Sequence, residues 1–276
     1  MSARARRDRP PSSLDVVRLA TWNVNSIRAR AERVGAWLER SDVDVVALQE
    51  TKARDDQFPY DVFKDAGYEV AHLGGSQWNG VAIASRVGLS DVVHGFPGMP
   101  EWGDPPVQES RALGALCGGV RVWSLYVPNG RALADPHLQY KLRWLEALRV
   151  AGAGWLAEDP EAQVALVGDW NIAPRDEDVW DMRLFATSTH VSPPERAAFA
   201  AVVEAGYADV VRPYTEGEFT YWDYTQLRFP RREGMRIDFV LASPALARRV
   251  TGASIDRQER KGKGASDHAP VIVDLV

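Results

Sequence analysis

The chain has 276 residues, of which 45% are hydrophobic and 26% charged, and this composition excludes a disordered, collagen-like or disulfide-scaffold protein. It contains no run of about 18 apolar residues, so the sequence predicts no transmembrane helix. The formal net charge of −5 argues mildly against a nucleic-acid partner, although basic residues can still gather on one face.

The first residues are basic, and no apolar stretch follows the positive charges, so they do not predict a secretory signal. We therefore predict a mobile basic arm over residues 1–15, a single folded domain over 16–276 and a cytoplasmic location. The single cysteine, Cys117, lies in an apolar, glycine-rich stretch. This setting favours a buried strand residue over a reactive thiol.

The apolar patterning predicts strands and helices that interleave along the chain. Residues 18–23 alternate as in a strand, and Ile27, Ala31, Val34 and Leu38 recur at helical spacing. The almost continuous apolar run over 43–48 is typical of a strand that is buried on both faces. Further strands are predicted at 68–72, 81–85, 120–127, 164–167, 237–242 and 271–275, and helices at 136–156 and 195–205. No linker divides the chain, so we expect one α/β or α+β domain with helices packed outside sheets.

One short pattern occurs twice. Trp22-Asn23 and Trp170-Asn171 each precede an aliphatic residue at the exit of a predicted strand. The repeat has two explanations. It is either a coincidence, or the mark of a pseudo-symmetric fold in which two similar halves bring equivalent strand ends together.

Polar side chains stand at the ends of the predicted strands. They are Asn23, Glu50, Tyr126, Asp169, Asn171, Asp238, Asp267 and His268. Each has an ordinary explanation as a turn former, a helix cap, a surface ion pair or a core tyrosine. In a mixed sheet, however, the start of an antiparallel strand lies at the same edge as the end of its neighbour, so all of them could meet at one rim. The buried strands beside them would then hold them rigidly.

Seven segments carry a resemblance to a known family. They are Thr21-Trp-Asn-Val-Asn-Ser-Ile-Arg28, Leu48-Gln-Glu-Thr-Lys52, Trp78-Asn-Gly-Val-Ala-Ile-Ala-Ser-Arg86, Tyr126-Val-Pro-Asn-Gly130, Gly168-Asp-Trp-Asn-Ile-Ala-Pro174, Arg236-Ile-Asp-Phe239 and Ser266-Asp-His268. In this order they resemble the exonuclease III family of abasic-site endonucleases, and the match runs from about Arg18 to Leu275. The resemblance implies a single-domain, deoxyribonuclease I-like fold, a four-layer sandwich of two packed mixed sheets flanked by helices.

The resemblance implies a metal site at the rim. Glu50 would be the main carboxylate ligand of Mg²⁺ or Mn²⁺, Asn23 and Asp267 would lie beside it, and Asp169 and Asn171 would adjoin the same site. Mg²⁺ prefers carboxylate, amide and water oxygens, so an Asp, Glu and Asn set without cysteine suits it better than zinc. Whether one ion or two act stays open.

The resemblance also implies catalytic roles. Asp169 would orient or deprotonate the attacking water or protonate the leaving oxygen, and Asn171 would hold the phosphate. His268, oriented by Asp238, would contact a phosphate oxygen or shuttle a proton. Tyr126 would donate to the phosphate or to the leaving oxygen. These roles agree with the needs of phosphodiester hydrolysis, which are a positioned water and stabilisation of the charge on the phosphoryl oxygens.

Several residues are candidates for DNA contact. They are Lys52, Asn129, Trp222, Arg236, Lys261 and Lys263, and most lie in or near two basic stretches, 227–236 and 257–264. Trp222 matches the family loop whose aromatic residue enters the site of the missing base, and its alternative is a packed loop tryptophan. Asn25 stands where human-type enzymes have aspartate. The chain therefore looks bacterial in type, and a metal contact from this position is in doubt.

We expect a monomeric, magnesium-dependent nuclease of duplex DNA without a membrane partner. It would cut on the 5′ side of abasic sites, remove nucleotides in the 3′ to 5′ direction and strip blocking groups from 3′ ends. The alternative is a phosphatase or phosphodiesterase of the same fold that acts on inositol phosphates or phospholipid headgroups, because fold alone does not separate the two. The basic aromatic loop over 221–236 favours DNA, and the intact set of acidic residues and His268 disfavours an inactive binding module.

Overall fold

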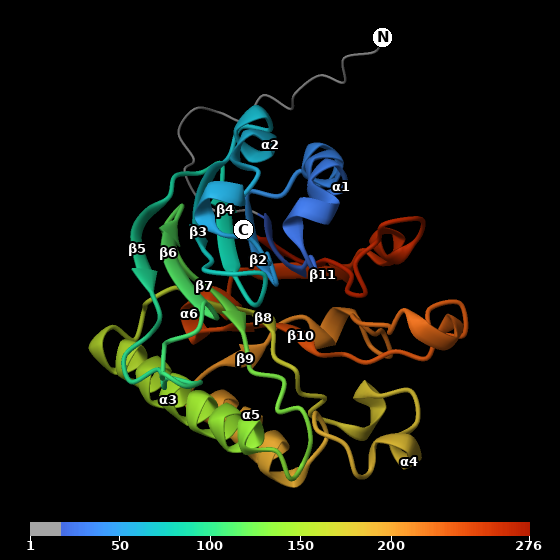
Figure 1. Ribbon diagram of the computed structural model, residues 1–276. Coiled ribbons are helices and arrows are strands. Elements are labelled where there is room, and N and C mark those ends of the chain that lie inside the picture. The colour runs from blue at the N-terminus through green and yellow to red at the C-terminus, as the bar shows by residue number, and fades with distance from the viewer. Residues whose placement is uncertain (1–17) are drawn as a thin grey trace.

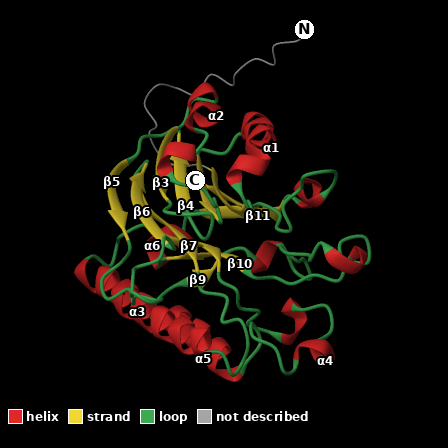
Figure 2. Cartoon of the chain, in the orientation of Figure 1, coloured by secondary structure: helices red, strands yellow, loops and turns green. Residues whose placement is uncertain are grey.

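Two six-stranded mixed sheets pack face to face at the centre of the structure, and helices cover the outer face of each (Figures 1 and 2). The computed structural model describes residues 18–276, so the arm predicted over 1–15 lies outside the described residues. The sheets and helices form the four-layer sandwich that the family resemblance implied.

The first sheet carries the amino-terminal strands. Its order is β11 (Val250–Ile255), β12 (Val271–Leu275), β1 (Arg18–Asn23), β2 (Val45–Gln49), β4 (Val81–Ser85) and β3 (Glu69–Leu73). The central pair β1 and β2 is parallel, and every other neighbouring pair is antiparallel.

The second sheet is built in the same way. Its order is β5 (Ser90–His94), β6 (Ala112–Cys117), β7 (Val120–Tyr126), β8 (Val164–Asp169), β10 (Asp238–Ala242) and β9 (Ala208–Asp209). Here β7 and β8 form the parallel pair. Strands β1 and β8 therefore occupy equivalent positions, each with one parallel and one antiparallel neighbour, and each ends at one copy of the Trp-Asn pattern. The topology supports the pseudo-symmetric explanation of the repeat.

The helices divide between the two sheets. They are α1 (Ile27–Ser41), α2 (Tyr60–Asp65), α3 (Pro136–Glu158), α4 (Met182–Phe185), α5 (Pro193–Glu204) and α6 (Pro244–Ala247), with short 3₁₀ turns at Asp55–Gln57, Asp176–Asp178, Arg212–Tyr214, Thr225–Leu227 and Arg257–Arg260. Helices α1 and α2 pack on the first sheet through Trp37 and Phe63, and α3 and α5 pack on the second through Trp144 and Phe199. Across the described residues, no helix is both long and apolar enough to cross a membrane.

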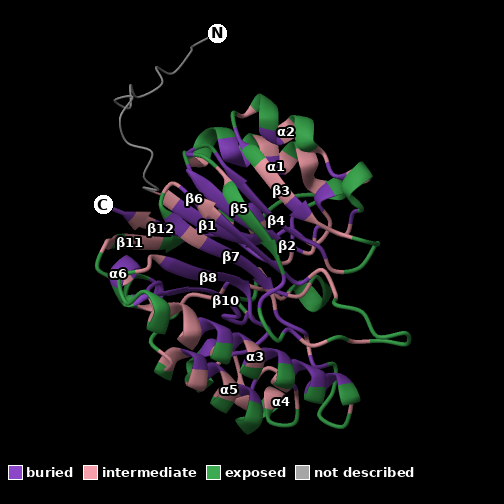
Figure 3. Ribbon diagram, turned by 90° about the vertical axis from the view of Figure 1, so that its left-hand side faces the viewer, coloured by how far each residue is buried: buried purple, intermediate pink, exposed green. Residues whose placement is uncertain are grey.

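Three apolar layers alternate with the elements. One lies between the sheets and two lie between a sheet and its helices, so the central strands are buried while the outer helix faces are exposed (Figure 3). Each fully buried aliphatic side chain stabilises the fold by roughly 1.5–3 kcal/mol. The strands that end at the rim of the sandwich are thus held on both faces.

The predicted elements are confirmed with shifts of a few residues at their ends, but four strands were missed. Strands β5 and β11 lie at sheet edges, where most side chains are exposed or half-buried and no apolar pattern arises, and β9 has only two residues. In β6 the apolar sequence pattern is interrupted by Gly114, where a Cβ would lie 2.9 Å from the Trp123 ring. Cys117 ends β6 and is buried, and burial raises the pKa of its thiol to about 12, which confirms the interpretation as a buried strand residue.

Candidate active site

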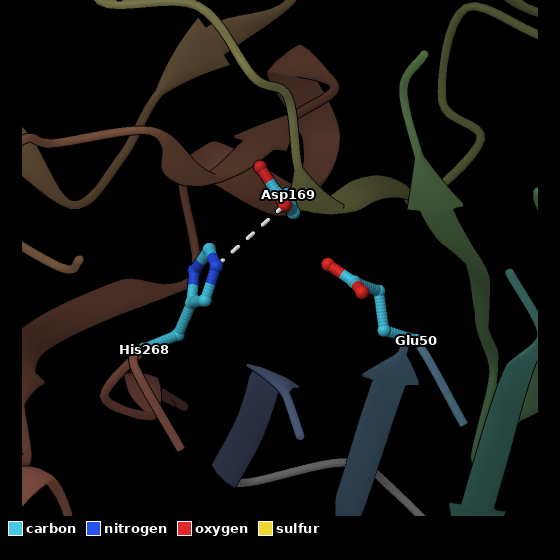
Figure 4. A group of neighbouring side chains, drawn as sticks. All are labelled: Glu50, Asp169 and His268. Atoms are coloured by element: carbon cyan, nitrogen blue, oxygen red, sulfur yellow. Dashed lines mark ion pairs between the residues drawn. The ribbon is translucent and has the colours of Figure 1, made fainter. Parts of the chain in front are cut away.

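The polar strand-end residues meet at one rim of the sandwich, as predicted. Asn23 ends β1, Glu50 follows β2, Asp169 ends β8, Asp238 begins β10, and His268 precedes β12. The side chains of Glu50, Asp169 and His268 point toward one centre (Figure 4). One potential metal-ligand atom from each of these three lies within 4.8 Å of the others. The fold thus brings together residues from the beginning, the middle and the end of the chain.

A close approach of two strands places Asp169. In the parallel β7–β8 pair, Asp169 lies opposite Tyr126. The preceding residue, Gly168, has a φ of 145°, and a Cβ there would lie 1.9 Å from the carbonyl oxygen of Leu125. Only glycine therefore allows the two strands to approach so closely at the rim.

Two site residues hold a left-handed backbone conformation. Glu50 and Asn171 both have a φ of 51°. Such conformations cost roughly 1–3 kcal/mol each in non-glycine residues and persist only where the surrounding structure maintains them. At Glu50, the backbone nitrogen of Ser26 donates to the carbonyl oxygen at 2.7 Å, which helps to hold the turn.

Amide groups join the carboxylates. The Nδ2 of Asn23 donates to Glu50 Oε1 at 2.8 Å and to Asp169 Oδ2 at 2.9 Å. The backbone nitrogen of Asn171 donates to Asp169 Oδ1 at 2.9 Å, and Asn129 Nδ2 donates to Asn171 Oδ1 at 3.0 Å. The orientation of Asp169 is thus fixed by hydrogen bonds on both oxygens.

A buried His–Asp pair stands opposite Asp169. His268 Nδ1 lies 2.8 Å from Asp238 Oδ2, and His268 Nε2 lies 3.8 Å from Asp169 Oδ2. Burial lowers the pKa of His268, but the two carboxylates outweigh this effect and raise it to about 10. The imidazole is therefore a cation near neutral pH, with its Nδ1–H held by Asp238 and its Nε2–H facing the site.

The pKa values of the two carboxylates at the centre are shifted in opposite directions. Burial, together with the charges of Asp238 and Glu50, raises the pKa of Asp169 to about 7 against the opposing effect of His268. Burial also acts to raise the pKa of Glu50, but Lys52 and a hydrogen bond from Asn23 lower it overall. Glu50 is thus suited to bind a cation, and Asp169 is suited to exchange a proton near neutrality.

The residues fit a hard divalent cation. The carboxylates of Glu50 and Asp169 supply hard oxygen donors without sulfur, and they converge beside the imidazole of His268. Asp267 is not one of these three residues, and its Oδ1 accepts a hydrogen bond from Asn25 Nδ2 at 3.0 Å. Its predicted part in metal binding stays a prediction, as do those of Asn23 and Asn171.

Four of the predicted DNA-contact residues are exposed or half-buried. Lys52 lies at the rim, with Nζ 2.7 Å from Glu50 Oε2, and Asn129 is hydrogen-bonded to Asn171. Lys261 and Lys263 are exposed in the loop that follows β11. Their part in DNA binding stays a prediction.

Arg236 does not reach the surface. It is 2% exposed, its guanidinium donates to both carboxylate oxygens of Asp209 at 2.8 and 2.9 Å, and it stacks on the Phe239 ring at 4.5 Å. The prediction that Arg236 binds DNA is therefore wrong. The sequence of the basic stretch 227–236 does not reveal which of its arginine side chains are buried.

Trp222 is also buried. It is 1% exposed, and its ring packs edge-on against Phe229 at 5.0 Å with the guanidinium of Arg257 at 5.3 Å. A Cβ at Gly234 would lie 2.5 Å from the Trp222 indole nitrogen, so the glycine makes room for the ring. This position contradicts the predicted role as a wedge in DNA, and the alternative of a packed loop tryptophan is the one that fits.

We therefore expect Trp222→Ala to destabilise the protein. Removing a buried tryptophan costs about 3–5 kcal/mol of unfolding free energy, because a cavity replaces its packing. Urea denaturation followed by circular dichroism measures the change. Leu227→Ala in the same loop, at a side chain that is 72% exposed, is the control and should stay within about 0.5 kcal/mol of the parent. Parent stability in Trp222→Ala would contradict the assignment to the core.

Sequence reasoning missed several residues behind the site. Lys141 on α3 is fully buried in an ion pair with Glu195 on α5, and its Nζ donates to the carbonyl oxygen of Asn171 at 2.6 Å. The Nε2 of His190 lies 3.2 Å from Asn171 Oδ1, and the Tyr221 ring lies 4.9 Å from that of His268. The one available signal was a lysine at helical spacing within the apolar stripe of α3.

Comparisons with known proteins agree with this geometry. Residues 20–268 match the model of the Endonuclease/Exonuclease/phosphatase family. Exodeoxyribonuclease III of Haemophilus influenzae is 29% identical over 273 residues, which cover 94% of this chain and 100% of that protein. A Neisseria 3′ phosphatase bound to a product DNA hairpin has a TM-score of 0.88 at 33% identity, and the match covers 94% of this chain and 99% of the other. An AP endonuclease from Archaeoglobus fulgidus has a TM-score of 0.87 at 33% identity with the same coverage. The chain therefore belongs to the Endonuclease/Exonuclease/phosphatase family and, within it, to the nucleases of the exonuclease III type.

Proposed function

We propose that this chain is a Mg²⁺- or Mn²⁺-dependent nuclease of duplex DNA. It hydrolyses the backbone on the 5′ side of abasic sites and removes nucleotides and blocking groups from 3′ ends. The observation that carries the proposal is the convergence of ligand atoms from Glu50, Asp169 and His268 within 4.8 Å of one another at the rim of the sheets. The similarity to an exodeoxyribonuclease III, an AP endonuclease and a 3′ phosphatase supports it.

Glu50 is the main candidate ligand of the cation in this proposal. Its carboxylate stays ionised because its pKa is lowered, and Asn23 holds one of its oxygens. Asp267 and Asn171 adjoin the site as further candidates. When bound, a divalent cation stabilises negative charge on a phosphoryl oxygen.

The remaining groups act on the proton and the phosphate. Asp169 accepts the proton of the attacking water, which its position and its pKa near neutrality support. His268, held by Asp238, directs a cationic N–H toward a phosphate oxygen. Asn171 binds the phosphate through its amide. Burial and the charge of Glu50 raise the pKa of Tyr126, so its hydroxyl keeps the hydrogen that it donates to the phosphate or to the leaving oxygen.

A groove beside the site suits a DNA strand. It has a volume of about 300 Å³ and is lined by residues of two loops, among them Tyr224, Leu227, Arg228, Arg260 and Lys261. Both loops project on the same side of the molecule (Figure 1). Tyr224 is 51% exposed, so in place of the buried Trp222 it and Leu227 offer apolar surface to unstacked bases. The exposed aromatic and basic side chains of this lining can stack on bases and contact phosphates along a strand, which favours DNA over a small phosphorylated headgroup.

Removing Lys261 and Lys263, the two lysines in the loop that follows β11, should weaken DNA binding on all sequences. In the double variant Lys261→Ala with Lys263→Ala, the slope of log K against log salt should flatten by about one unit for each phosphate that a lysine no longer neutralises. Fluorescence anisotropy at several salt concentrations measures the slope. Lys64→Ala on α2, an exposed lysine away from the two loops, is the control. An unchanged slope in the double variant would place these lysines away from DNA.

One assay tests the proposed function. An end-labelled duplex with a single abasic site is compared with an intact duplex that has a recessed 3′ end and with one that carries a 3′ phosphate, each with Mg²⁺ or with EDTA. We expect metal-dependent cleavage at the abasic site and shortening or dephosphorylation of the 3′ ends. Activity at the 3′ ends alone would remove the endonuclease part of the proposal. Phosphate release from inositol phosphates without any cleavage of DNA would replace it with the headgroup alternative.

A further inference from the structure

A threonine, a histidine and an aspartate form a hydrogen-bonded line beside Glu50. Thr51 Oγ1 lies 2.8 Å from His72 Nε2, and His72 Nδ1 lies 2.7 Å from Asp55 Oδ1. The order of groups is that of a nucleophilic triad. However, Thr51 is fully buried and the side chain of His72 has no exposed surface. No substrate can reach the hydroxyl, so the line does not serve nucleophilic attack.

The partners decide where the protons lie. The Asp55 side chain is 64% exposed, and as a solvated carboxylate it accepts the hydrogen of His72 Nδ1. The Nε2 of the neutral ring is then an acceptor, and the Thr51 hydroxyl donates to it. Burial lowers the pKa of His72 although Asp55 acts to raise it, which agrees with a neutral ring. Asp55 therefore sets the tautomer that holds the Thr51 side chain.

Packing leaves these side chains one arrangement. A Cβ at Gly80 would lie 2.1 Å from Thr51 Oγ1, and a Cβ at Gly74 would lie 2.6 Å from His72 Cε1. The Phe58 ring packs against the imidazole, with 4.4 Å between the two ring centroids. Both glycines thus open the space that the line occupies, and an aromatic ring supports the histidine.

The line is attached to the turn that aims Glu50. Glu50 and Lys52, on either side of Thr51, have φ values of 51° and 49°, so the backbone is left-handed at two non-glycine residues. Backbone hydrogen bonds tie Thr51 to Gly80 and Lys52 to Asn79 at 3.1 and 2.9 Å. The Thr51 hydroxyl adds a side-chain tie from this turn to β3, which carries His72. An unfavourable turn of this kind persists only where its surroundings hold it.

We propose that Thr51, His72 and Asp55 are positioning residues that hold the Glu50 turn in the conformation that binds the cation. The inference rests on the proposed function, because it takes Glu50 as the main ligand. Side chains that orient a metal-binding group typically change metal affinity by about 10- to 100-fold when they are removed. Variants of these three residues should therefore change the affinity for the metal, and this change should be measurable in the absence of DNA.

The test is Mn²⁺ binding to the metal-free protein, measured by electron paramagnetic resonance without DNA. Thr51→Val removes the hydroxyl and keeps the shape, so Mn²⁺ affinity should fall by about tenfold. Thr51→Ser keeps the hydroxyl and should restore binding to within about twofold of the parent. Thr215→Val is the matched control, since this buried hydroxyl donates to the carbonyl oxygen of Val211 at 3.0 Å and does not contact the site. It should leave Mn²⁺ affinity unchanged.

Asp55→Ala tests the outer end of the line without changing the core. Without Asp55, the hydrogen of His72 is no longer held on Nδ1, so Nε2 is a less constant acceptor for the Thr51 hydroxyl. Mn²⁺ affinity should therefore fall by a few-fold, while thermal unfolding shows that the protein is folded. Parent-like affinity in both Thr51→Val and Asp55→Ala would overturn the positioning role and leave the metal proposal intact. Absence of Mn²⁺ binding in the parent itself would overturn the metal proposal and this inference with it.

Discussion

Asp169→Asn is expected to reduce turnover by about 10²- to 10⁴-fold while DNA affinity stays near that of the parent. Positioned proton transfer contributes a factor of this size, and asparagine keeps the bulk of the side chain without its ability to accept a proton. Single-turnover cleavage of an abasic duplex gives the rate, and fluorescence anisotropy gives the affinity. Asp91→Asn on the exposed edge strand β5 is the matched control and should retain the parent rate.

The same experiment separates the members of the His–Asp pair. His268→Ala should reduce the rate by several orders of magnitude, because it removes the cationic donor that faces Asp169. Asp238→Asn should have a smaller effect, because the imidazole remains and only its orientation and charge are disturbed. A parent-like rate in Asp169→Asn would show that another group transfers the proton.

Removal of divalent metal is expected to abolish cleavage completely. The carboxylates of Glu50 and Asp169 converge beside His268, and two carboxylates this close together repel a phosphate unless a divalent cation lies between them and the substrate. Activity should vanish in EDTA and return with Mg²⁺ or Mn²⁺. Glu50→Ala should raise the Mg²⁺ concentration for half-maximal activity by more than about tenfold, because removing even an indirect partner of a metal typically costs that much affinity.

The control for the metal experiment is Glu146→Ala. This glutamate is paired with Arg149 on the exposed face of α3, so its removal should not change the metal requirement. Full cleavage in EDTA would remove the metal proposal. An unchanged Mg²⁺ requirement in Glu50→Ala would instead move the cation to other ligands at the rim.

A buried ion pair lies behind the site and supports it. Lys141 and Glu195 form an ion pair without exposed side-chain surface and hold the loop that carries Asn171. Breaking a buried pair by removing one partner leaves an uncompensated charge and is strongly destabilising. Variants of this pair therefore report on folding, and they are unsuitable as probes of catalysis.

Most of the fold could be predicted from local pattern. The buried strands β2 and β8 have continuous apolar runs, and α1 shows helical spacing, because the environment of such elements imposes their composition directly. Edge strands such as β5 and β11 lack this constraint, since one side of each faces solvent and no apolar alternation is required. These edge strands form because they pair with neighbours in the sheet, and an apolar pattern does not reveal such pairing.

The residue types at the strand ends, together with the motif resemblance, predicted which polar residues would lie together. Glu50, Asp169 and His268 stand directly beside apolar strands, so their meeting at one rim followed from strand order and from motif resemblance. The inward or outward orientation of the basic-loop side chains depended instead on three-dimensional packing, which placed Trp222 and Arg236 in the interior. Trp222 is buried against Phe229 and Arg236 is paired with Asp209, and no local sequence pattern predicts either contact. For the same reason, the line from Thr51 to Asp55 became visible only when β3 brought His72 beside the turn that carries Glu50.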